Sequence, residues 1–303
     1  MISPGKHGLC QVRLNREGKL FSKNYGLISS INTDPIEKKP LYHYYPGTKV
    51  LSVGSYGCNL ACQYCQNWQI SQVKPSLQEI SPALLVETAK KLGSPGIAYT
   101  YSEPSIWYEY IKDTAVIARD TGLKNIMITN AYISKEALEE LIPYLDAVNV
   151  DLKAFSGDFY QKYCHGSLTP VLENIKLLYS SSVHLELTTL LVNAYNDSID
   201  EIRDLLLWVK NLSLDIPVHF SRYFPAYKFE EPATPLEKMR QIFHLAEDYL
   251  NYVYLGNVNL KEGNNTRCPV CGCLLVRRDY YQVKSFLKTA ECPECGQLVY
   301  GKY

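Results

Sequence analysis

The apolar residues between about residue 50 and residue 255 follow two alternating patterns. Short apolar runs predict buried strands, and longer stretches with apolar residues three or four positions apart predict amphipathic helices between them. The candidate strands are Val50–Val53, Gly96–Tyr101, Asn125–Thr129, Ala147–Leu152, His184–Val192 and Val218–Tyr223, with Tyr252–Leu255 as a candidate seventh. The regular exchange of the two patterns indicates one continuous α/β region.

The starts of several predicted helices carry chemical markers. Ser81 and Thr234 each precede a proline, which fits the first turn of a helix because its missing N–H would have no partner there. Ser198 and Thr234 are each followed three residues later by a glutamate, the spacing of a capping box. We therefore expect helices to begin just after these three side chains.

Strands that alternate with helices in this way pair in parallel through right-handed helical crossovers. About six such units are fewer than the eight of a closed TIM barrel. We therefore predict an α/β fold with a partial (β/α)6 TIM-type barrel over residues 50–260. Residues 1–49 contain many glycine and turn residues and are expected to form an irregular lead-in, and residues 264–303 a separate compact unit.

The overall composition narrows the classes of protein that this chain can represent. Its 303 residues include 31 basic and 31 acidic side chains, so no net charge attracts nucleic acid or an anionic membrane. No apolar run approaches the roughly 20 residues that span a bilayer. The first residues, MISPGK, lack the apolar stretch of a signal peptide. We expect a cytoplasmic protein with no membrane contact, for which nucleic-acid binding is disfavoured.

Three of the ten cysteines form the most informative pattern in the sequence. Cys58, Cys62 and Cys65 lie at positions i, i+4 and i+7 of the run GCNLACQYCQN. Three thiolates on a cubic [4Fe–4S] cluster leave one iron free to bind a further ligand. The same spacing also fits one face of a buried helix. Gly57 and Asn59 are typical of loops, so we favour a ligand loop that follows a strand.

Polar residues occur at the ends of three predicted strands and within a fourth. Glu103 follows the second strand, Asn130 follows the third, Asp151 and Lys153 end the fourth, and His219 lies in the sixth. Each has an ordinary alternative: a helix-start charge for Glu103, a turn residue for Asn130, a surface ion pair for Asp151 and Lys153, and a core histidine for His219. Their joint occurrence indicates a polar site at the mouth of the barrel, where strand ends converge.

Five sequence runs together resemble a known family. The runs GCNLACQYCQN, YTYSEP, TNAY, VDLKAF and HFSRYFPAY are similar to motifs of the radical S-adenosylmethionine (SAM) component of the AmmeMemoRadiSam system, a relative of pyruvate formate-lyase activating enzymes. The similarity extends to DPIEKKPLYHYYPG and to the C-terminal cysteines. It implies an oxidoreductase-type enzyme in which SAM, bound to the open iron, is split by one electron. The resulting 5′-deoxyadenosyl radical then abstracts hydrogen from a substrate that the sequence does not identify.

The resemblance also assigns roles to individual residues. It implies that the cluster ligands and catalytic cysteines are Cys58, Cys62 and Cys65. It implies SAM contacts by Tyr64 at the adenine, Glu103 at the methionyl amine, Lys153 at the carboxylate with Asp151 beside it, and Asn130 and His219 near the ribose and adenosyl end. The implied partners are an electron donor such as a ferredoxin or flavodoxin, together with Memo-like and AMMECR-like proteins.

A second cysteine group lies near the C-terminus. Cys268 and Cys271 form one CxxC pair, and Cys292 and Cys295 form another after a spacer of twenty residues. Paired CxxC motifs at this spacing predict a zinc ribbon, although a rubredoxin-like iron site fits the same pattern. The residues between the pairs predict a short hairpin that needs the metal to fold. We hypothesise a structural module that caps the barrel or helps to dock a macromolecular substrate.

Two other functions remain open from the sequence. The first is a dedicated glycyl-radical enzyme activating enzyme, which would install a glycyl radical on a partner protein. The second is a non-catalytic metal-binding or nucleic-acid adaptor, which would release no 5′-deoxyadenosine and would bind oligonucleotides in a salt-sensitive way. Three further cysteines have no assigned role: Cys10 and Cys164 are interpreted as buried thiols, and Cys273 as a bystander of the C-terminal group.

Overall fold

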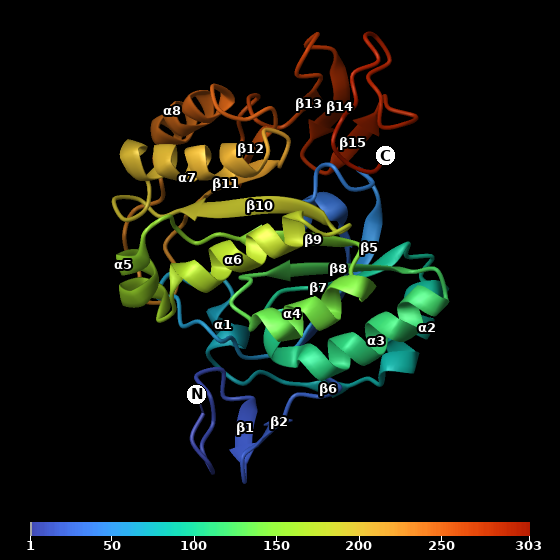
Figure 1. Ribbon diagram of the computed structural model, residues 1–303, viewed down its shortest axis with the longest axis vertical. Coiled ribbons are helices and arrows are strands. Elements are labelled where there is room, and N and C mark those ends of the chain that lie inside the picture. Colours follow the sequence, from blue (N-terminus) through green and yellow to red (C-terminus); the bar gives the residue numbers. More distant parts are fainter. Residues whose placement is uncertain (1) are drawn as a thin grey trace.

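The computed structural model describes residues 2–303, and its main feature is an eight-stranded sheet (Figure 1). The strand order is β12-β11-β10-β9-β8-β7-β5-β4, with β4 antiparallel to β5 and all other pairs parallel. The strands are β4 (Ser30–Pro35), β5 (Lys49–Gly54), β7 (Gly96–Tyr99), β8 (Lys124–Thr129), β9 (Ala147–Asp151), β10 (His184–Leu191), β11 (Val218–Arg222) and β12 (Val253–Gly256). All seven strands expected from the apolar runs are present, which confirms a mostly parallel α/β sheet.

Helices connect the successive parallel strands. The longer ones are α2 (Pro82–Lys91), α3 (Tyr108–Asp120), α4 (Lys135–Leu141), α6 (Leu168–Tyr179), α7 (Ile199–Leu212) and α8 (Leu236–Glu247). The short ones are α1 (Trp68–Ser71), α5 (Gly157–Phe159), the 3-10 helices η1 (Ile36–Lys38), η2 (Pro104–Trp107) and η3 (Ile142–Tyr144), and the π-helix η4 (Tyr160–Cys164). Within residues 2–303, no helix combines the length and the apolar character that crossing a bilayer requires.

The predicted helix starts are confirmed at two of three places. The Ser81 and Ser198 side chains accept hydrogen bonds from the backbone N–H groups of Leu84 and Glu201, as N-caps do. The prediction for Thr234 is wrong, because α8 begins after Pro235 without a side-chain cap. The Thr234 hydroxyl is instead fully buried and joins the ends of β10 and β11, where it donates to the Leu191 carbonyl.

The two faces of the main sheet are covered by different parts of the chain. Neighbouring residues of a strand point to opposite faces. Leu51, Ile97 and Met127 belong to the large core that the helices share. Their neighbours Val50, Ala98 and Ile126 pack instead against side chains of residues 36–44, including Ile36 and Leu41. The segment that follows β4 therefore covers the face that the helices leave free.

The N-terminal region is more regular than the sequence predicted. Besides β4, it contains β1 (Arg13–Arg16), β2 (Lys19–Ser22) and β3 (Leu27–Ile28), of which β1 and β2 form a hairpin at the end of the molecule opposite the C-terminal unit (Figure 1). The expectation of an irregular lead-in over residues 1–49 is therefore corrected. β4 lies at the sheet edge and carries the polar sequence SINTDP, so it lacks the apolar run by which the other strands were recognised.

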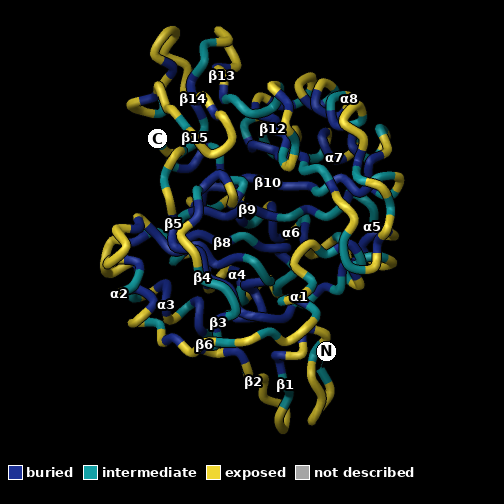
Figure 2. The backbone as a smooth tube through the Cα atoms, turned by 180° about the vertical axis from the view of Figure 1, so that it is seen from behind, coloured by how far each residue is buried: buried dark blue, intermediate teal, exposed yellow. Residues whose placement is uncertain are grey.

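The C-terminal residues form a small sheet of their own. It consists of β13 (Thr266–Arg267), β14 (Leu274–Asp279) and β15 (Gln282–Ser285), and the antiparallel β14–β15 pair confirms the predicted hairpin. Its core contains Leu275 and Val276 together with Tyr252 and Tyr254 from the end of the main sheet. Figure 2 shows that the central strands are mostly buried, whereas the loops of this unit are largely exposed.

Candidate active site

A cavity of about 710 Å³ extends from the carboxyl ends of the parallel strands toward the covering segment 36–44. Small-molecule sites commonly have about 300–1,000 Å³, so this volume fits such a site. All nine residues that the sequence singled out for the cluster and for SAM line this cavity: Cys58, Cys62, Tyr64, Cys65, Glu103, Asn130, Asp151, Lys153 and His219. The fold thus brings together side chains that are spread over about half of the chain.

The three cysteines of the first group lie on a loop after β5. Residues 58–65 contain no helix, so the alternative of a helix face is wrong. At Gly57 the backbone has a φ of 89°, and a Cβ there would lie 2.5 Å from the Cys10 carbonyl oxygen, which excludes larger residues. Backbone hydrogen bonds from Ala61 to Cys164 and from Gln63 to Tyr163 hold the loop against η4. The loop is therefore fixed at both its start and its middle.

The sulfur atoms of this loop have few protein contacts and are candidate metal ligands. The Leu60 N–H points at Cys58 Sγ over 3.4 Å, and Cys65 Sγ lies 3.2 Å from Ser71 Oγ. Burial raises the pKa of the Cys58 and Cys65 thiols, so without metal they hold their protons. Metal binding displaces such protons, and thiolates are the usual ligands of iron–sulfur clusters. Three cysteine donors on one partly buried loop fit a [4Fe–4S] cluster with one iron left open.

Glu103 lies just before η2, and its carboxylate is almost completely engaged. It accepts hydrogen bonds from Thr129 Oγ1 (2.6 Å), from the Asn130 N–H (2.8 Å) and from the Ser105 N–H (2.9 Å). Burial raises its pKa, while these donors act in the opposite direction. A carboxylate has about four acceptor positions, so one remains for a cation in the cavity.

Asp151 and Lys153 form an ion pair at the end of β9. Lys153 Nζ lies 2.8 Å from Asp151 Oδ2, and the two side chains are 20% and 37% exposed, so the pair is partly buried rather than on the open surface. Burial alone would lower the pKa of Lys153, but the charge of Asp151 raises it overall. Lys153 therefore remains a cation at the cavity wall.

Asn130 occupies the same region and is held from both sides. Its amide nitrogen donates to Asn59 Oδ1 over 2.8 Å and points toward Cys58 Sγ over 3.7 Å. Its amide oxygen accepts from the Tyr132 N–H at 2.9 Å. Asn130 thus connects the cysteine loop to the end of β8.

His219 belongs to a buried polar cluster that sequence reasoning missed. Its Nε2 lies 2.7 Å from Glu186 Oε2, and Glu186 is completely buried in the middle of β10. His184 Nε2 lies 2.9 Å from the other carboxylate oxygen. Burial opposes ionisation, but these histidine contacts hold the pKa of Glu186 well below its usual range. A glutamate inside the apolar run HLELTTLL was the available signal.

The Tyr64 side chain extends from the cysteine loop toward Cys164. The Tyr64 ring packs near Phe159 and Phe229, with centroids 5.6 and 5.8 Å away, and its hydroxyl lies 3.3 Å from Cys164 Sγ. Cys164 ends η4, is fully buried and does not line the cavity. Cys10 is buried too, in a small cluster with Val12 and Tyr56. The interpretation of both cysteines as buried thiols is confirmed.

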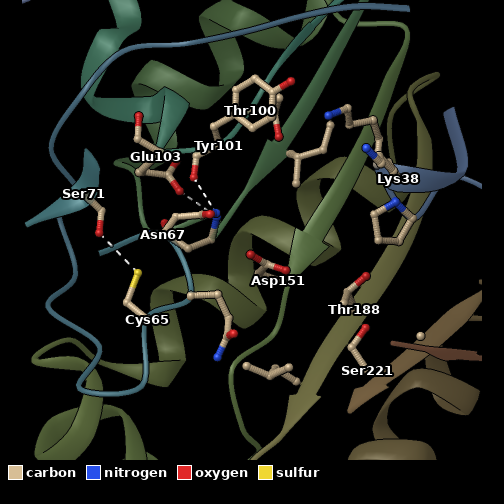
Figure 3. Close-up of a pocket in the computed structure, with 18 of the residues that line it drawn as sticks. Lys38, Cys65, Asn67, Ser71, Thr100, Tyr101, Glu103, Asp151, Thr188 and Ser221 are labelled. Atoms are coloured by element: carbon tan, nitrogen blue, oxygen red, sulfur yellow. Dashed lines mark hydrogen bonds between the residues drawn. The ribbon is translucent and has the colours of Figure 1, made fainter. Parts of the chain in front are cut away.

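The far side of the cavity contains charged groups that the sequence did not single out. They come from β4 and from the segment that follows it: Asp34, Lys38 and Lys39. Figure 3 shows Lys38 across the pocket from Cys65, with Asp151 between them. These residues lie within the run DPIEKKPLYHYYPG, whose position over the sheet no local pattern indicates.

Four residues at the mouth of the cavity have a left-handed backbone conformation. Tyr101, Ala131, Ala194 and Asn257 have φ values of 69°, 52°, 65° and 58°, although none of them is glycine. They follow β7, β8, β10 and β12 respectively, all at the carboxyl edge of the sheet. Such left-handed residues concentrate at functional sites, where the surrounding structure holds them in place.

The second cysteine group forms a compact four-sulfur site. The sulfurs of Cys268, Cys271, Cys292 and Cys295 all lie within 4.8 Å of one another, which fits one tetrahedral metal ion. Cys273 lies outside the four-sulfur group, in agreement with its interpretation as a bystander.

Comparison with known proteins indicates the family of this chain. A model of the radical SAM superfamily matches residues 52–209. An uncharacterized protein of Methanocaldococcus jannaschii is 44% identical over 99% of this chain and 92% of its own length. A putative glycyl-radical enzyme activating enzyme of the same organism is 27% identical over 56% of this chain and 65% of its own length.

Two solved structures have the same fold at low sequence identity. SuiB of Streptococcus suis bound to S-adenosylmethionine has a TM-score of 0.56 at 14% identity and matches 69% of this chain, which spans about half (52%) of SuiB. A radical SAM methyltransferase of Sphaerobacter thermophilus also has a TM-score of 0.56, at 15% identity over 76% of this chain and 71% of its own. The non-catalytic adaptor loses support from these matches. The chain belongs to the radical SAM superfamily, whose members are enzymes that use a [4Fe–4S] cluster and SAM.

Proposed function

We propose that this chain is a radical SAM enzyme of the AmmeMemoRadiSam type, which cleaves SAM reductively and abstracts a hydrogen atom from a substrate. The observation that carries the proposal is the convergence of three loop cysteines and six polar or aromatic side chains on one cavity at the carboxyl edge of a parallel sheet. The cluster and SAM supply the one-electron chemistry. The protein holds both groups, excludes water and orients the substrate.

Each side chain has a proposed task in holding these groups. Cys58, Cys62 and Cys65 ligate three irons and leave the fourth for the amino and carboxylate groups of SAM. The free acceptor position of Glu103 takes the methionyl ammonium, and the Lys153 cation takes the carboxylate. Tyr64, Asn130 and His219 border the adenosyl part, and Asp151 orients Lys153. A zwitterionic ligand needs such an acceptor and cation side by side, and both are present in the cavity.

The proposal extends to the architecture and the partners. We infer a partial (β/α)6 barrel over residues 50–260 and a zinc-ribbon-like module over residues 264–303. This module binds zinc and caps the barrel. The sequential strand order and the four-sulfur site support this interpretation. Radical SAM enzymes need an electron donor, for which we propose a ferredoxin or flavodoxin in the cytoplasm. Memo-like and AMMECR-like proteins are the proposed partners in the same system.

Anaerobic reconstitution tests the proposed activity. Protein loaded with iron and sulfide is treated with dithionite and SAM, and 5′-deoxyadenosine and methionine are measured. We expect both products from the wild type and none from Cys58→Ala, Cys62→Ala or Cys65→Ala, whereas the matched control Cys273→Ala keeps its cavity cluster. A cluster with four protein ligands, or the absence of iron from this loop, would contradict the proposal.

A glycyl-radical activating enzyme is the second candidate. It is favoured by the similarity to putative activating enzymes of Methanocaldococcus jannaschii, which are 27% and 25% identical to this chain. Incubation with candidate partner proteins, SAM and reductant distinguishes the two functions. A glycyl radical detected by electron paramagnetic resonance on a partner supports the second candidate, whereas 5′-deoxyadenosine formed with a small-molecule product supports the first.

A further inference from the structure

We propose that Lys38 and Lys39 form a subsite for an anionic group of the substrate, a carboxylate or a phosphate, at the far side of the cavity. This inference rests on the proposed function, since it assigns a substrate class to the same cavity. Neither lysine belongs to the set proposed above for the cluster or for SAM. Both line the cavity together with Asp34.

The segment that carries the lysines is firmly attached to the sheet. Ile36 and Leu41 are buried in the apolar cluster that covers the free sheet face. The Pro40 carbonyl accepts a hydrogen bond of 2.7 Å from Asn149 Nδ2 on β9. The position of the two ammonium groups is therefore set by the fold and not by a freely moving loop.

The charges at this end of the cavity do not balance. Lys39 Nζ lies 2.8 Å from Asp34 Oδ2, and Lys38 Nζ lies 3.3 Å from Asp34 Oδ1, so two cations share one carboxylate. Asp34 is a stable anion: burial opposes its ionisation, but Lys39 and Tyr101 lower its pKa to about 2. One positive charge is left over for a ligand.

The other carboxylates that line the cavity are engaged elsewhere. Glu37 accepts from the Gly47 N–H and lies 3.9 Å from Arg278 Nε, in a pair with almost no exposure. Asp151 is paired with Lys153, and Glu103 accepts from three protein donors. Among the described residues that line the cavity, Asp34 is therefore the one carboxylate that forms an ion pair with Lys38 and Lys39.

The two lysines differ in a way that suits a binding site. Lys39 is 3% exposed and lies over the Tyr101 ring at 4.5 Å from its centroid, so its ammonium group is held in place. Burial lowers the pKa of Lys39, while the hydrogen bond to Asp34 acts in the opposite direction. Lys38 is 46% exposed and lies 5.5 Å from the ring centroid of Tyr281, at the turn between β14 and β15. Lys38 can therefore turn toward an incoming anion, with the C-terminal unit forming the rim of the subsite.

A second, independent feature of the cavity wall also indicates a ligand. Thr188 is 6% exposed, and its hydroxyl has no hydrogen-bond partner among residues 2–303. It lies on β10 with Asp151 and His219 as its neighbours on the adjacent strands. A buried hydroxyl without a partner costs free energy, which a bound polar ligand would recover. Thr188 thus provides an unpartnered hydroxyl in the wall of the cavity that Lys38 and Lys39 also line.

Calorimetric binding of small anions to the reconstituted protein tests this subsite. The probes are inorganic phosphate and malonate, with glycerol as the neutral comparison, each titrated without SAM. We expect both anions to bind more tightly than glycerol. Lys38→Ala and Lys39→Met should each weaken anion binding about tenfold, because a charge-assisted contact is lost. Asp34→Asn should strengthen it, because the lysines lose their internal counterion.

The controls separate this inference from the proposed function. Lys91→Ala on α2 removes a 70% exposed lysine outside the cavity and should leave anion binding unchanged. Equal affinities for anions and glycerol would overturn the subsite. So would unchanged anion affinity in Lys38→Ala and Lys39→Met together with no gain of affinity in Asp34→Asn. Formation of 5′-deoxyadenosine is assayed on the same preparation: if it fails while anions bind, the proposed function fails and the subsite remains.

Discussion

The imidazole of His219 is 2.7 Å from the carboxylate of Glu186, and this contact links the cavity wall to the C-terminal unit. The same carboxylate accepts from the backbone N–H groups of Tyr42 and His43 at 3.0 and 2.7 Å. His43 Nδ1 in turn lies 2.6 Å from the Tyr300 carbonyl oxygen. Glu186 therefore joins the sheet, the covering segment and the C-terminal residues in one buried network.

Replacing Glu186 by glutamine should destabilise the protein strongly. The amide would present a donor to groups that now donate to the carboxylate, and breaking a buried, paired charge costs about 3–5 kcal/mol. The measurement is urea unfolding of metal-free protein at pH 7, with the exposed Glu139→Gln on α4 as the matched control. Equal unfolding midpoints for Glu186→Gln and the wild type would contradict a structural role of this network.

We expect the difference in stability between the wild type and Glu186→Gln to depend on pH. The folded pKa of Glu186 lies below its ordinary value of 4.5, so its stabilisation is complete above that pH and is lost as the pH falls toward the folded value. The stability gap between the wild type and Glu186→Gln should therefore shrink below pH 4.5. Unfolding curves at a series of pH values test this, and a gap that is constant down to acid unfolding would argue against it.

Cys164→Ala should keep its iron–sulfur cluster. The Cys164 sulfur interacts with the Cys62 sulfur and with the Tyr64 hydroxyl, but it does not line the cavity. Iron and sulfide analysis should give the wild-type content for Cys164→Ala and a large loss for Cys62→Ala. Equal iron loss in the two variants would make Cys164 a fourth ligand and would remove the open iron on which SAM binding depends.

The parallel strands and the residues at their carboxyl ends could be predicted from the sequence for the same physical reason. Strands buried on both faces form unbroken apolar runs, as in His184–Leu191, and these stand out from the amphipathic helices. Because all parallel strands end at one edge, Glu103 and Asp151 had to lie near the cysteine loop once the strands were known. The location of the candidate site followed from the topology without any contact information, whereas the roles of its residues came from the sequence resemblance.

What could not be predicted depends on contacts between distant parts of the chain. β4 is a polar edge strand, and its Asp34 meets the cavity only because residues 36–44 fold across the sheet. Arg278 lies on the C-terminal hairpin, yet its side chain is buried and donates to the Tyr42 carbonyl at 2.6 Å. No local periodicity reports a partner 236 positions away in the sequence.

Lys153→Met should weaken SAM binding without loss of the cluster. Methionine keeps much of the side-chain length but removes the cation that we propose for the SAM carboxylate, and hydrogen bonds to charged groups contribute about 1.5–3 kcal/mol, at least tenfold in affinity. Anaerobic equilibrium dialysis with labelled SAM measures the dissociation constant. Lys135→Met, which removes a 68% exposed lysine on α4, is the control, and Lys153→Arg should restore part of the affinity. Unchanged binding in Lys153→Met would refute this role.

Loss of the C-terminal metal should destabilise the main sheet as well as the small unit. Cys292→Ala removes one of the four sulfurs, and a unit of this size depends on its metal for folding. Its unfolding would withdraw Arg278 from Glu37 and from the Tyr42 carbonyl, leaving Glu37 buried without its counter-charge. We therefore expect one thermal transition at a lowered temperature rather than unfolding of the small unit alone. Circular dichroism measures the transition, and zinc and iron analysis measures the metal content.

Cys273→Ala is the matched control for this experiment, because its sulfur lies outside the four-sulfur group of the same unit. It should retain the metal and the wild-type transition. Arg278→Met tests the coupling separately: it keeps all four sulfurs and therefore the metal, but it removes the buried contacts to Tyr42 and Glu37 and should lower the main transition. If Cys292→Ala loses its metal while the main transition and the cavity cluster stay unchanged, the C-terminal unit does not cap the sheet.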